Sequence, residues 1–134
     1  MLFRSPFLKP VYDDPQFIVR NIWRLYGGWW DGEPDTLLPA PRAEQARAWV
    51  ELAGGLTPVL KRARALLAAG DARLACHLVE FAVLAEPGSA EAHDLRRAVY
   101  TARSREQAST MGRNILNHAA LASEQGRRDL AGPG

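Results

Sequence analysis

The chain has 134 residues, 47% of them hydrophobic and 24% charged, which are the proportions of a folded domain and exclude a disordered chain. Seventeen Lys and Arg residues nearly balance fifteen Asp and Glu residues, and the formal net charge of +2 gives no electrostatic argument for nucleic-acid binding. Because Cys76 is the single cysteine, no internal disulfide can form, and we expect a cytoplasmic protein.

The N-terminal segment MLFRSPFLKP lacks the apolar middle of a secretory signal, and no apolar stretch approaches the roughly 20 residues that a membrane-spanning helix needs. A chain of this length encloses one hydrophobic core. We therefore expect a single domain over residues 1–134 without membrane contact, with an ordered core over about 11–122 and a flexible tail over 123–134.

The first helix is expected after Asp14, a good N-cap residue, with Pro15 at the first helical position. It should end near Tyr26, because the two glycines that follow favour a helix end. One face is apolar at helical spacing and is formed by Phe17, Ile18, Ile22, Leu25 and Tyr26.

Residues 29–41, WWDGEPDTLLPAP, contain three prolines and a glycine and predict an extended loop. Trp29 and Trp30 at its start should cover an apolar surface, since each aromatic side chain can bury ~150–250 Å². A second helix is expected between Pro41 and the glycine pair at 54 and 55. Its inward residues are predicted to be Ala46, Trp49, Val50 and Ala53.

Two further helices follow in the middle of the chain. The third is predicted to start with Thr57 as its N-cap and Pro58 at its first position, and to end at Gly70. Asp71 then caps a helix over 72–86 that is apolar on most of its circumference. We expect that fourth helix to be nearly surrounded by its neighbours.

Ser89 is predicted to cap the fifth helix, and a last helix is expected from about Glu106 to Ala122. The residues of this last helix expected to face inward are Met111, Ile115 and Ala119. No stretch alternates between apolar and polar residues as a strand would. The sequence therefore predicts an all-α fold, a bundle of five to six helices.

Residues 56–89 resemble a tetratricopeptide unit, which is an antiparallel pair of helices. Ala75 and Ala82 are the small residues at the helix crossing, and Pro87 closes the unit. Arrays of such units usually need at least three copies to bury their faces, and this chain has one complete unit. Its apolar faces must therefore be covered by something else.

Three segments together resemble the dimerisation domain of alkylsulfatases related to metallo-β-lactamases. They are VYDDPQFIVRNIWRLYGGWWDGEPDTLLPAP at 11–41, ELAGG at 51–55 and GDARLACHLVEFAVLAEPGSAEAHDLRRAVY at 70–100. The resemblance covers about 11–120. It implies that the domain joins two subunits, next to a binuclear zinc hydrolase domain and a sterol-carrier-like domain.

The family's zinc-binding residues have no counterparts in this chain. It lacks a His-x-His-x-Asp-His run, and its histidines, His77, His93 and His118, fall on three different predicted helices. We therefore expect no catalytic residues, no cofactor and no metal site here, and no enzyme activity from the chain alone. Zinc is expected only in a separate catalytic domain.

Other candidate sites have simpler interpretations. His77 and Glu80 lie one helical turn apart, but one such pair is not a complete metal site, and we expect a local polar contact. Asp71 and Ser89 are expected to act as helix caps and not as members of a catalytic triad with His77. Cys76 lies among apolar residues and is predicted to be an inert core thiol.

A group of basic residues could suggest phosphate contacts but is interspersed with acidic residues. We expect these side chains on the solvent faces of amphipathic helices, with no nucleic-acid partner. They are Lys61, Arg62, Arg64, Arg96 and Arg97.

Aromatic residues around the end of the first helix are the best candidates for an interface, because aromatic residues concentrate in the buried centres of interfaces. Core packing is the competing interpretation. The candidate interface residues are Phe17, Ile22, Trp23, Tyr26, Trp29 and Trp30.

We predict a protein–protein association module that forms a homodimer, as part of or related to an alkylsulfatase that hydrolyses linear alkyl sulfate esters. The flexible segment 27–41 could allow the first helix to reach the other subunit. One alternative is an accessory subunit that binds a separately encoded metallo-β-lactamase-fold zinc hydrolase. Another is a tetratricopeptide-like scaffold that binds peptides.

Overall fold

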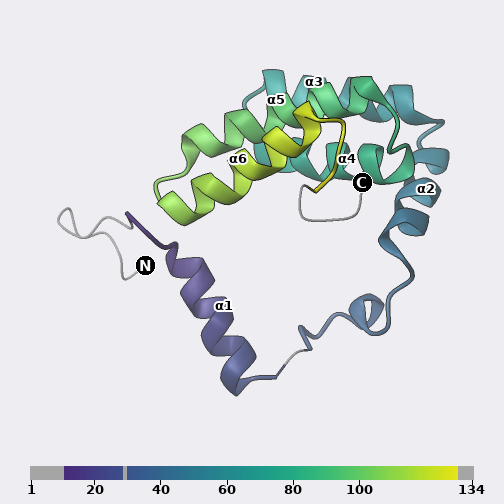
Figure 1. Ribbon diagram of the computed structural model, residues 1–134. Coiled ribbons are helices and arrows are strands. Elements are labelled where there is room, and N and C mark those ends of the chain that lie inside the picture. Colours follow the sequence, from purple (N-terminus) through teal and green to yellow (C-terminus); the bar gives the residue numbers. More distant parts are fainter. Residues whose placement is uncertain (1–10, 29, 130–134) are drawn as a thin grey trace.

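The computed structural model describes residues 11–28 and 30–129. All regular elements in these residues are helices, which confirms the predicted all-α fold. Helices α2 to α6 pack into one bundle, whereas the segment 13–41, which we call the arm, extends away from it (Figure 1). The elements are α1 (Pro15–Tyr26), η1 (Pro34–Thr36), α2 (Arg42–Leu52), α3 (Leu56–Ala68), α4 (Ala72–Ala85), α5 (Ala90–Glu106) and α6 (Thr110–Glu124).

Helix α4 is the centre of the bundle and contacts α2, α3 and α5, as its nearly continuous apolar surface predicts. Ala75 and Ala82 are fully buried, and small residues allow neighbouring helices to approach closely. The core around them includes Leu60, Ala63, Val79, Val83 and Val99. A tetratricopeptide-type arrangement of α3 and α4 stays a prediction.

The predicted helix caps are confirmed by hydrogen bonds. The carboxylate of Asp14 accepts from the backbone N–H of Gln16 at 2.8 Å, and that of Asp71 accepts from Leu74 at 3.0 Å. The Ser89 hydroxyl accepts from the N–H of Ala92 at 3.2 Å. Neither Asp71 nor Ser89 therefore needs a catalytic explanation.

Two predicted helix starts are wrong. Helix α3 begins at Leu56, one residue before the predicted Thr57 cap. Its N-cap is Gly55, whose φ of 111° is a conformation that glycine adopts without strain. Helix α5 continues to Glu106, so α6 cannot begin there and starts at Thr110 instead. The break is made by Ser109, whose hydroxyl accepts from the N–H of Gly112 at 3.1 Å.

Some residues predicted to face inward are exposed. Trp49 is 57% exposed and Ile115 is 58% exposed, and Ala53 is exposed as well. Helix α2 buries only Ala46 and Val50, because it contacts mainly one helix, α4. Helix α6 buries small residues against α5, namely Gly112, Ala120, Ala122 and Ser123.

The prediction that Arg96 lies on a solvent face is also wrong. Its side chain is 4% exposed and donates from Nε to Glu80 at 2.6 Å, and from Nη1 to the carbonyl of Ala119 and the hydroxyl of Ser123. These bonds join α5 to α4 and α6. A buried guanidinium is tolerated here because it is paired and hydrogen-bonded.

The remaining basic candidates, Lys61, Arg62, Arg64 and Arg97, are exposed as predicted. Two of them form surface ion pairs, Arg64 with Glu91 at 2.6 Å and Arg97 with Glu124 at 3.6 Å. Cys76 is buried in the core, as predicted.

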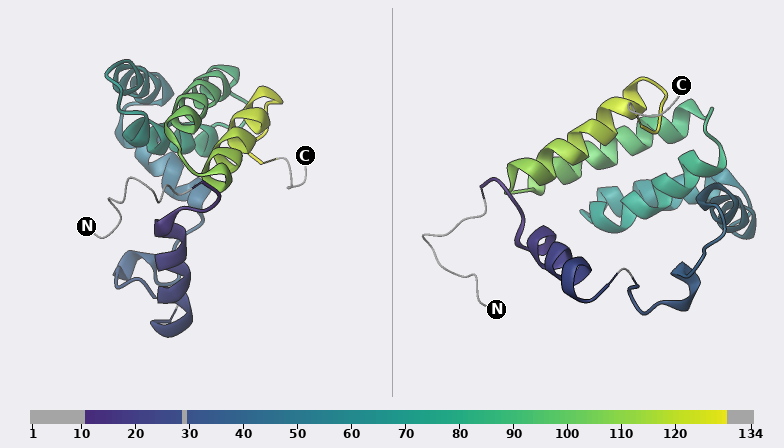
Figure 2. Two further views of the ribbon diagram at one scale, coloured as in Figure 1. Left: turned by 90° about the vertical axis from the view of Figure 1, so that its left-hand side faces the viewer. Right: turned by 60° about the horizontal axis from the view of Figure 1, so that its bottom comes forward.

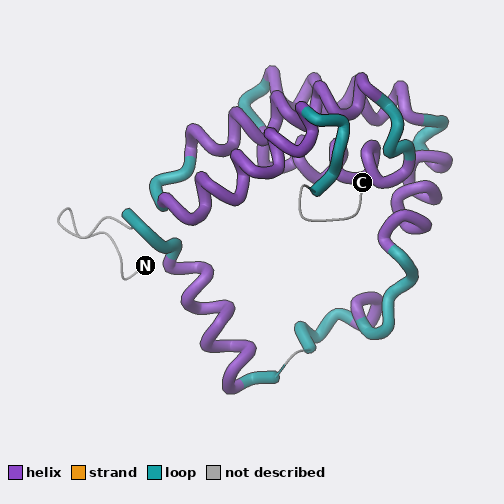
Figure 3. The backbone as a smooth tube through the Cα atoms, in the orientation of Figure 1, coloured by secondary structure: helices purple, strands orange, loops and turns teal. Residues whose placement is uncertain are grey.

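The arm and the bundle are joined at both ends of the arm, and two further views show α1 standing clear of the other helices (Figure 2). After α1 the arm is mostly loop, interrupted by the single turn η1 (Figure 3). Within the described part of the chain, no helix has the length and apolar character to cross a membrane.

Candidate association surface

The two residues before the arm, Val11 and Tyr12, are tied to the bundle by backbone hydrogen bonds at the start of α6. The first N–H groups of a helix have no partner within the helix. Here the N–H of Thr110 donates to the carbonyl of Val11 at 2.8 Å, and the N–H of Met111 donates to that of Tyr12 at 3.0 Å. The hydroxyl of Thr110 also donates to the Val11 carbonyl at 2.9 Å. Val11 and Tyr12 therefore have a defined place on the bundle.

Beyond this joint, the backbone of α1 comes close to no other helix of the described chain, and none of its residues is fully buried, although Phe17 is partly buried. Its apolar and polar residues are nevertheless separated onto two faces, as in a helix built to pack against a surface. Trp23 is 61% exposed and Tyr26 is 83% exposed. The exposed apolar residues of the arm, which we call the apolar arm face, are Ile18, Val19, Ile22, Trp23, Leu25, Tyr26, Trp30, Leu37 and Leu38.

The structure brings four of the predicted interface residues onto the arm's free surface. Ile22, Trp23 and Tyr26 line one side of α1, around an apolar hollow of about 440 Å³. Trp30 follows on the loop and is exposed. Trp29 lies outside the described residues, so its prediction has no structural counterpart.

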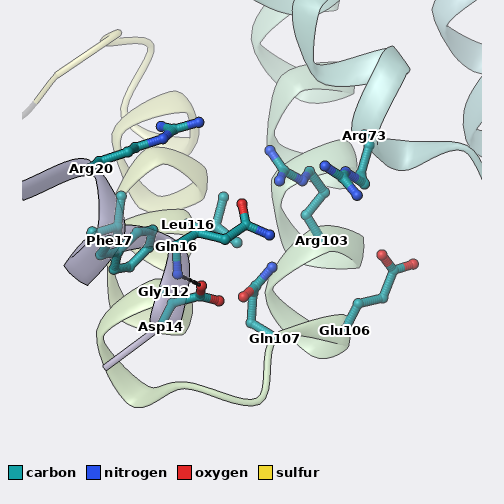
Figure 4. A pocket seen from close by; sticks show the side chains of 11 residues that line it. Asp14, Gln16, Phe17, Arg20, Arg73, Arg103, Glu106, Gln107, Gly112 and Leu116 are labelled. Carbon is teal, nitrogen blue, oxygen red and sulfur yellow. Dashed lines mark hydrogen bonds between the residues drawn. The ribbon is translucent and has the colours of Figure 1, made fainter. Parts of the chain in front are cut away.

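Phe17 occupies a different place from the other candidates. It is partly buried and lines a pocket of about 370 Å³ at the joint between α1 and the bundle. Figure 4 shows Phe17 beside α6, the helix that carries Gly112 and Leu116. Gln16 of α1, Arg103 of α5 and Gln107, which follows α5, also line this pocket. Phe17 thus belongs to the joint more than to the apolar arm face.

The end of α1 is shaped by Gly27, which approaches Trp23 closely. A Cβ atom added at Gly27 would lie 2.9 Å from the backbone oxygen of Trp23 and 3.1 Å from its indole ring. Any larger residue would therefore push the indole or the chain aside. Because glycine has no side chain, the loop that follows α1 can pass close to the indole of Trp23.

Sequence reasoning missed a second apolar surface, on the bundle. Trp49, Val50 and Ala53 of α2, Val59 of α3, and Leu78 and Phe81 of α4 line a hollow of about 360 Å³. Trp49 was expected inside the core, and its helical spacing gave no sign that it would border a groove. The molecule therefore has apolar surface exposed on both arm and bundle.

Polar groups of the bundle form one network around Glu80. Its carboxylate accepts from Arg96 at 2.6 Å, from the Tyr100 hydroxyl at 2.8 Å and from Arg128 at 3.2 Å. Burial raises the pKa of Glu80, but the charge of Arg96 and these hydrogen bonds outweigh burial, and the pKa lies below its ordinary value. Burial and the Glu80 charge raise the pKa of Tyr100 far above the usual range.

This network replaces the polar contact predicted between His77 and Glu80. His77 is exposed, and Glu80 turns instead toward α5 and the segment after α6. The arrangement has an ionised acceptor and fixed donors but no nucleophile beside a base. It joins helices and performs no evident chemistry.

Comparison with known proteins places this architecture in a family. The family model for alkyl sulfatase dimerisation matches residues 1–126. An (R)-specific secondary-alkylsulfatase from Pseudomonas is 30% identical over 125 residues, covering 93% of this chain and 19% of that protein. A linear primary-alkylsulfatase from Pseudomonas is 34% identical over 92 residues, covering 69% of this chain and 17% of that protein.

Solved structures agree. A stereoselective inverting sec-alkylsulfatase, Pisa1 from Pseudomonas, superposes with a TM-score of 0.76 at 30% identity, over 81% of this chain and 17% of that chain. Its S233Y F250G double mutant superposes with a TM-score of 0.82 at 29% identity, over 87% and 18%.

The chain thus spans less than a fifth of the length of these relatives. The family match covers the arm as well as the bundle. On this evidence the chain belongs to the alkyl sulfatase dimerisation family.

Proposed function

We propose that this chain is a homodimerisation module in which the apolar arm face of each copy packs against the other copy. The observation that supports this most is α1, an amphipathic helix with no fully buried residue and no close backbone contact with another helix of the described chain. The family's association with dimerisation points in the same direction.

The low stability of short isolated helices suggests that α1 packs against another surface. Isolated helices shorter than about 12–15 residues are marginal in water, and α1 has 12 residues. Tertiary packing of the apolar face normally provides the missing stability. A cover supplied by a second copy would stabilise the helix and hide its tryptophan and tyrosine from water at the same time.

The expected affinity is consistent with this arrangement. A dissociation constant of 1 μM corresponds to about 8 kcal/mol of binding free energy. Burying one large apolar side chain contributes about 1.5–3 kcal/mol, and a two-fold interface makes every contact twice. Association itself costs about 4–15 kcal/mol, so micromolar binding needs several side chains of the apolar arm face in both copies.

The arm is attached to its own bundle at both ends and can meet a second copy without detaching. The residues before it are held at α6, and its C-terminal end leads through a loop into α2, so α1 stands away from the bundle (Figure 1). We therefore favour a dimer in which the two arms reach across to the opposite copies.

Sedimentation of the purified chain tests the proposal. A homodimer predicts a species of twice the 14.8 kDa chain mass at micromolar concentration. A stable monomer of 14.8 kDa at these concentrations would reject it. An accessory subunit would instead sediment as a monomer that binds an added hydrolase, and a peptide scaffold as a monomer that binds peptides.

In a longer protein we propose that this module pairs two alkylsulfatase subunits, each with a metallo-β-lactamase-fold hydrolase domain acting on linear alkyl sulfate esters. The support is that the similar proteins are named as alkylsulfatases and are more than five times longer than the matched region. Sulfatase activity of the parent protein, absent from the isolated 134-residue chain, is the expected result.

We propose that this module itself holds no zinc. Residues 11–28 and 30–129 contain no group of three or more His, Cys, Asp or Glu side chains that could hold a metal ion. The donor set of a binuclear zinc site therefore does not fit these residues. We propose that any zinc chemistry belongs to the hydrolase domain alone.

A further inference from the structure

A polar pocket on the bundle has a charge imbalance that dimerisation does not explain. It has a volume of about 430 Å³ and is bordered by α2, α4, α5, α6 and the segment after α6. We call it the basic pocket. Its charged lining has four guanidinium groups and two carboxylates, from Arg42, Arg96, Arg103, Arg128, Glu80 and Asp129. The formal charges of these six groups sum to +2, with His77 and His118 left out of the count.

The two carboxylates in this count already have partners. Glu80 binds both Arg96 and Arg128 through its two oxygens, and its lowered pKa keeps it ionised. Asp129 lies 3.3 Å from His118. These contacts form a fixed wall of the pocket, because Arg96 is also held by a carbonyl of α6.

Within residues 11–28 and 30–129, the other two guanidinium groups have no such counter-charge. Arg103 donates from Nη1 to the sulfur of Cys76 at 3.0 Å, and a cysteine sulfur is a weak acceptor. No carboxylate of the described chain forms an ion pair with Arg42 or Arg103. Arg42 lies on α2 and Arg103 on α5, and both side chains line the basic pocket.

Guanidinium groups that meet in a concave site favour a particular ligand. Their planar N–H groups bind oxyanions through paired, charge-assisted hydrogen bonds, and a cleft of one charge sign raises the local concentration of counter-ions. An ion with two negative charges would balance the pocket. We propose that the basic pocket is a binding site for a small, doubly charged tetrahedral oxyanion, such as sulfate or hydrogen phosphate, held mainly by Arg42 and Arg103.

Isothermal titration calorimetry of the 134-residue chain tests this site. Sodium sulfate and sodium phosphate are each titrated at an ionic strength matched with sodium chloride. We expect one saturable site per chain for either oxyanion and none for chloride. Equal heats in sulfate, phosphate and chloride would overturn the proposal.

Variants locate the site. Arg103→Gln and Arg42→Gln should each weaken oxyanion binding by about tenfold or more, since each removes one charge-assisted contact. Arg64→Gln is the matched control: Arg64 forms a surface pair with Glu91 away from the pocket, and its variant should bind as the wild type does.

Circular dichroism establishes that each variant keeps its helices. If Arg103→Gln fails to fold, Arg42→Gln decides the matter, because Arg42 is exposed at the first turn of α2. Wild-type affinity in folded Arg42→Gln would overturn the assignment. So would an Arg64→Gln variant weakened as much as Arg42→Gln, since that would reflect general charge and not a site.

Discussion

Helices α1 and α4 are similar in length and opposite in surroundings. Helix α4 has 14 residues and buries six of them between three neighbouring helices, whereas α1 has 12 residues and buries none. Both begin at an aspartate cap that accepts a backbone hydrogen bond. The same kind of cap therefore starts a helix in the arm and in the bundle, and what differs is how much of the apolar face other helices cover.

This difference separates two kinds of stability in one chain. The bundle is stabilised by its own core and by the Glu80 network, so its variants should act on folding. The arm has no such support within one copy, so its variants should act on association. Each prediction below tests that division.

The largest expected effect is on association, in Trp23→Ala. Loss of the indole from both copies should weaken the dimer by about 3–6 kcal/mol, twice the value of one buried large side chain, while changing monomer stability by less than about 0.5 kcal/mol. Sedimentation equilibrium measures the first quantity, and denaturation at low protein concentration measures the second.

Leu52→Ala is the matched control for that variant, since Leu52 is also a highly exposed apolar residue but lies on the bundle. Its dimer should resemble the wild type. Equal weakening in both variants would mean that the arm has no special part in association.

The next effect is on folding, in Glu80→Gln. This change leaves Arg96 buried without its carboxylate, and breaking a buried pair costs about 3–5 kcal/mol. Urea denaturation measures the loss. Asp35→Asn in η1 of the arm removes an exposed carboxylate and should change stability by no more than about 0.5 kcal/mol. A mild Glu80→Gln phenotype would show that the network contributes little.

A core truncation compares the two regions directly. Leu60→Ala in the bundle should cost about 2–5 kcal/mol, because Leu60 is almost fully buried and a cavity would remain. Leu38→Ala in the arm should be nearly neutral for the monomer, because Leu38 is almost fully exposed. Similar losses at the two positions, measured by thermal unfolding, would contradict the division.

The smallest effect concerns pH. The pKa of Glu80 is lower in the folded chain than its ordinary 4.5, so the unfolded chain binds the proton more readily. The stability that Glu80 contributes is present above pH 4.5 and is lost as the pH falls through the folded pKa. Unfolding free energies measured in acid should show this slope in the wild type and less of it in Glu80→Gln.

Much of the fold is readable from local signals. Asp14, Asp71 and Ser89 mark helix starts because a short polar side chain can accept a free N–H, and that chemistry is visible in sequence. The break between α5 and α6 was placed too early because it contains no Gly or Pro. Ser109 was its signal, and a serine alone is a weak one.

Contacts between residues that are far apart in the chain could not be predicted from the sequence. Arg96 looked like a solvent-facing arginine because its burial depends on Glu80, sixteen positions away, and on the carbonyl of Ala119. Trp49 has the spacing of a core residue, but α2 contacts too few neighbours to enclose it. Of the candidate interface residues, Trp23 and Tyr26 are exposed on α1, and their place in an interface stays a prediction. The separation of Phe17 from them needed the three-dimensional arrangement.

Hydrogen–deuterium exchange of the α1 amides across a range of protein concentrations asks most directly what covers the arm. If a second copy packs on the apolar arm face, the amides of Ile18 to Tyr26 should be protected at concentrations where the dimer forms and exchange rapidly on dilution, while those of α4 stay protected throughout. Protection of α1 that does not change with concentration, or that is absent even at the highest concentration, would contradict the account.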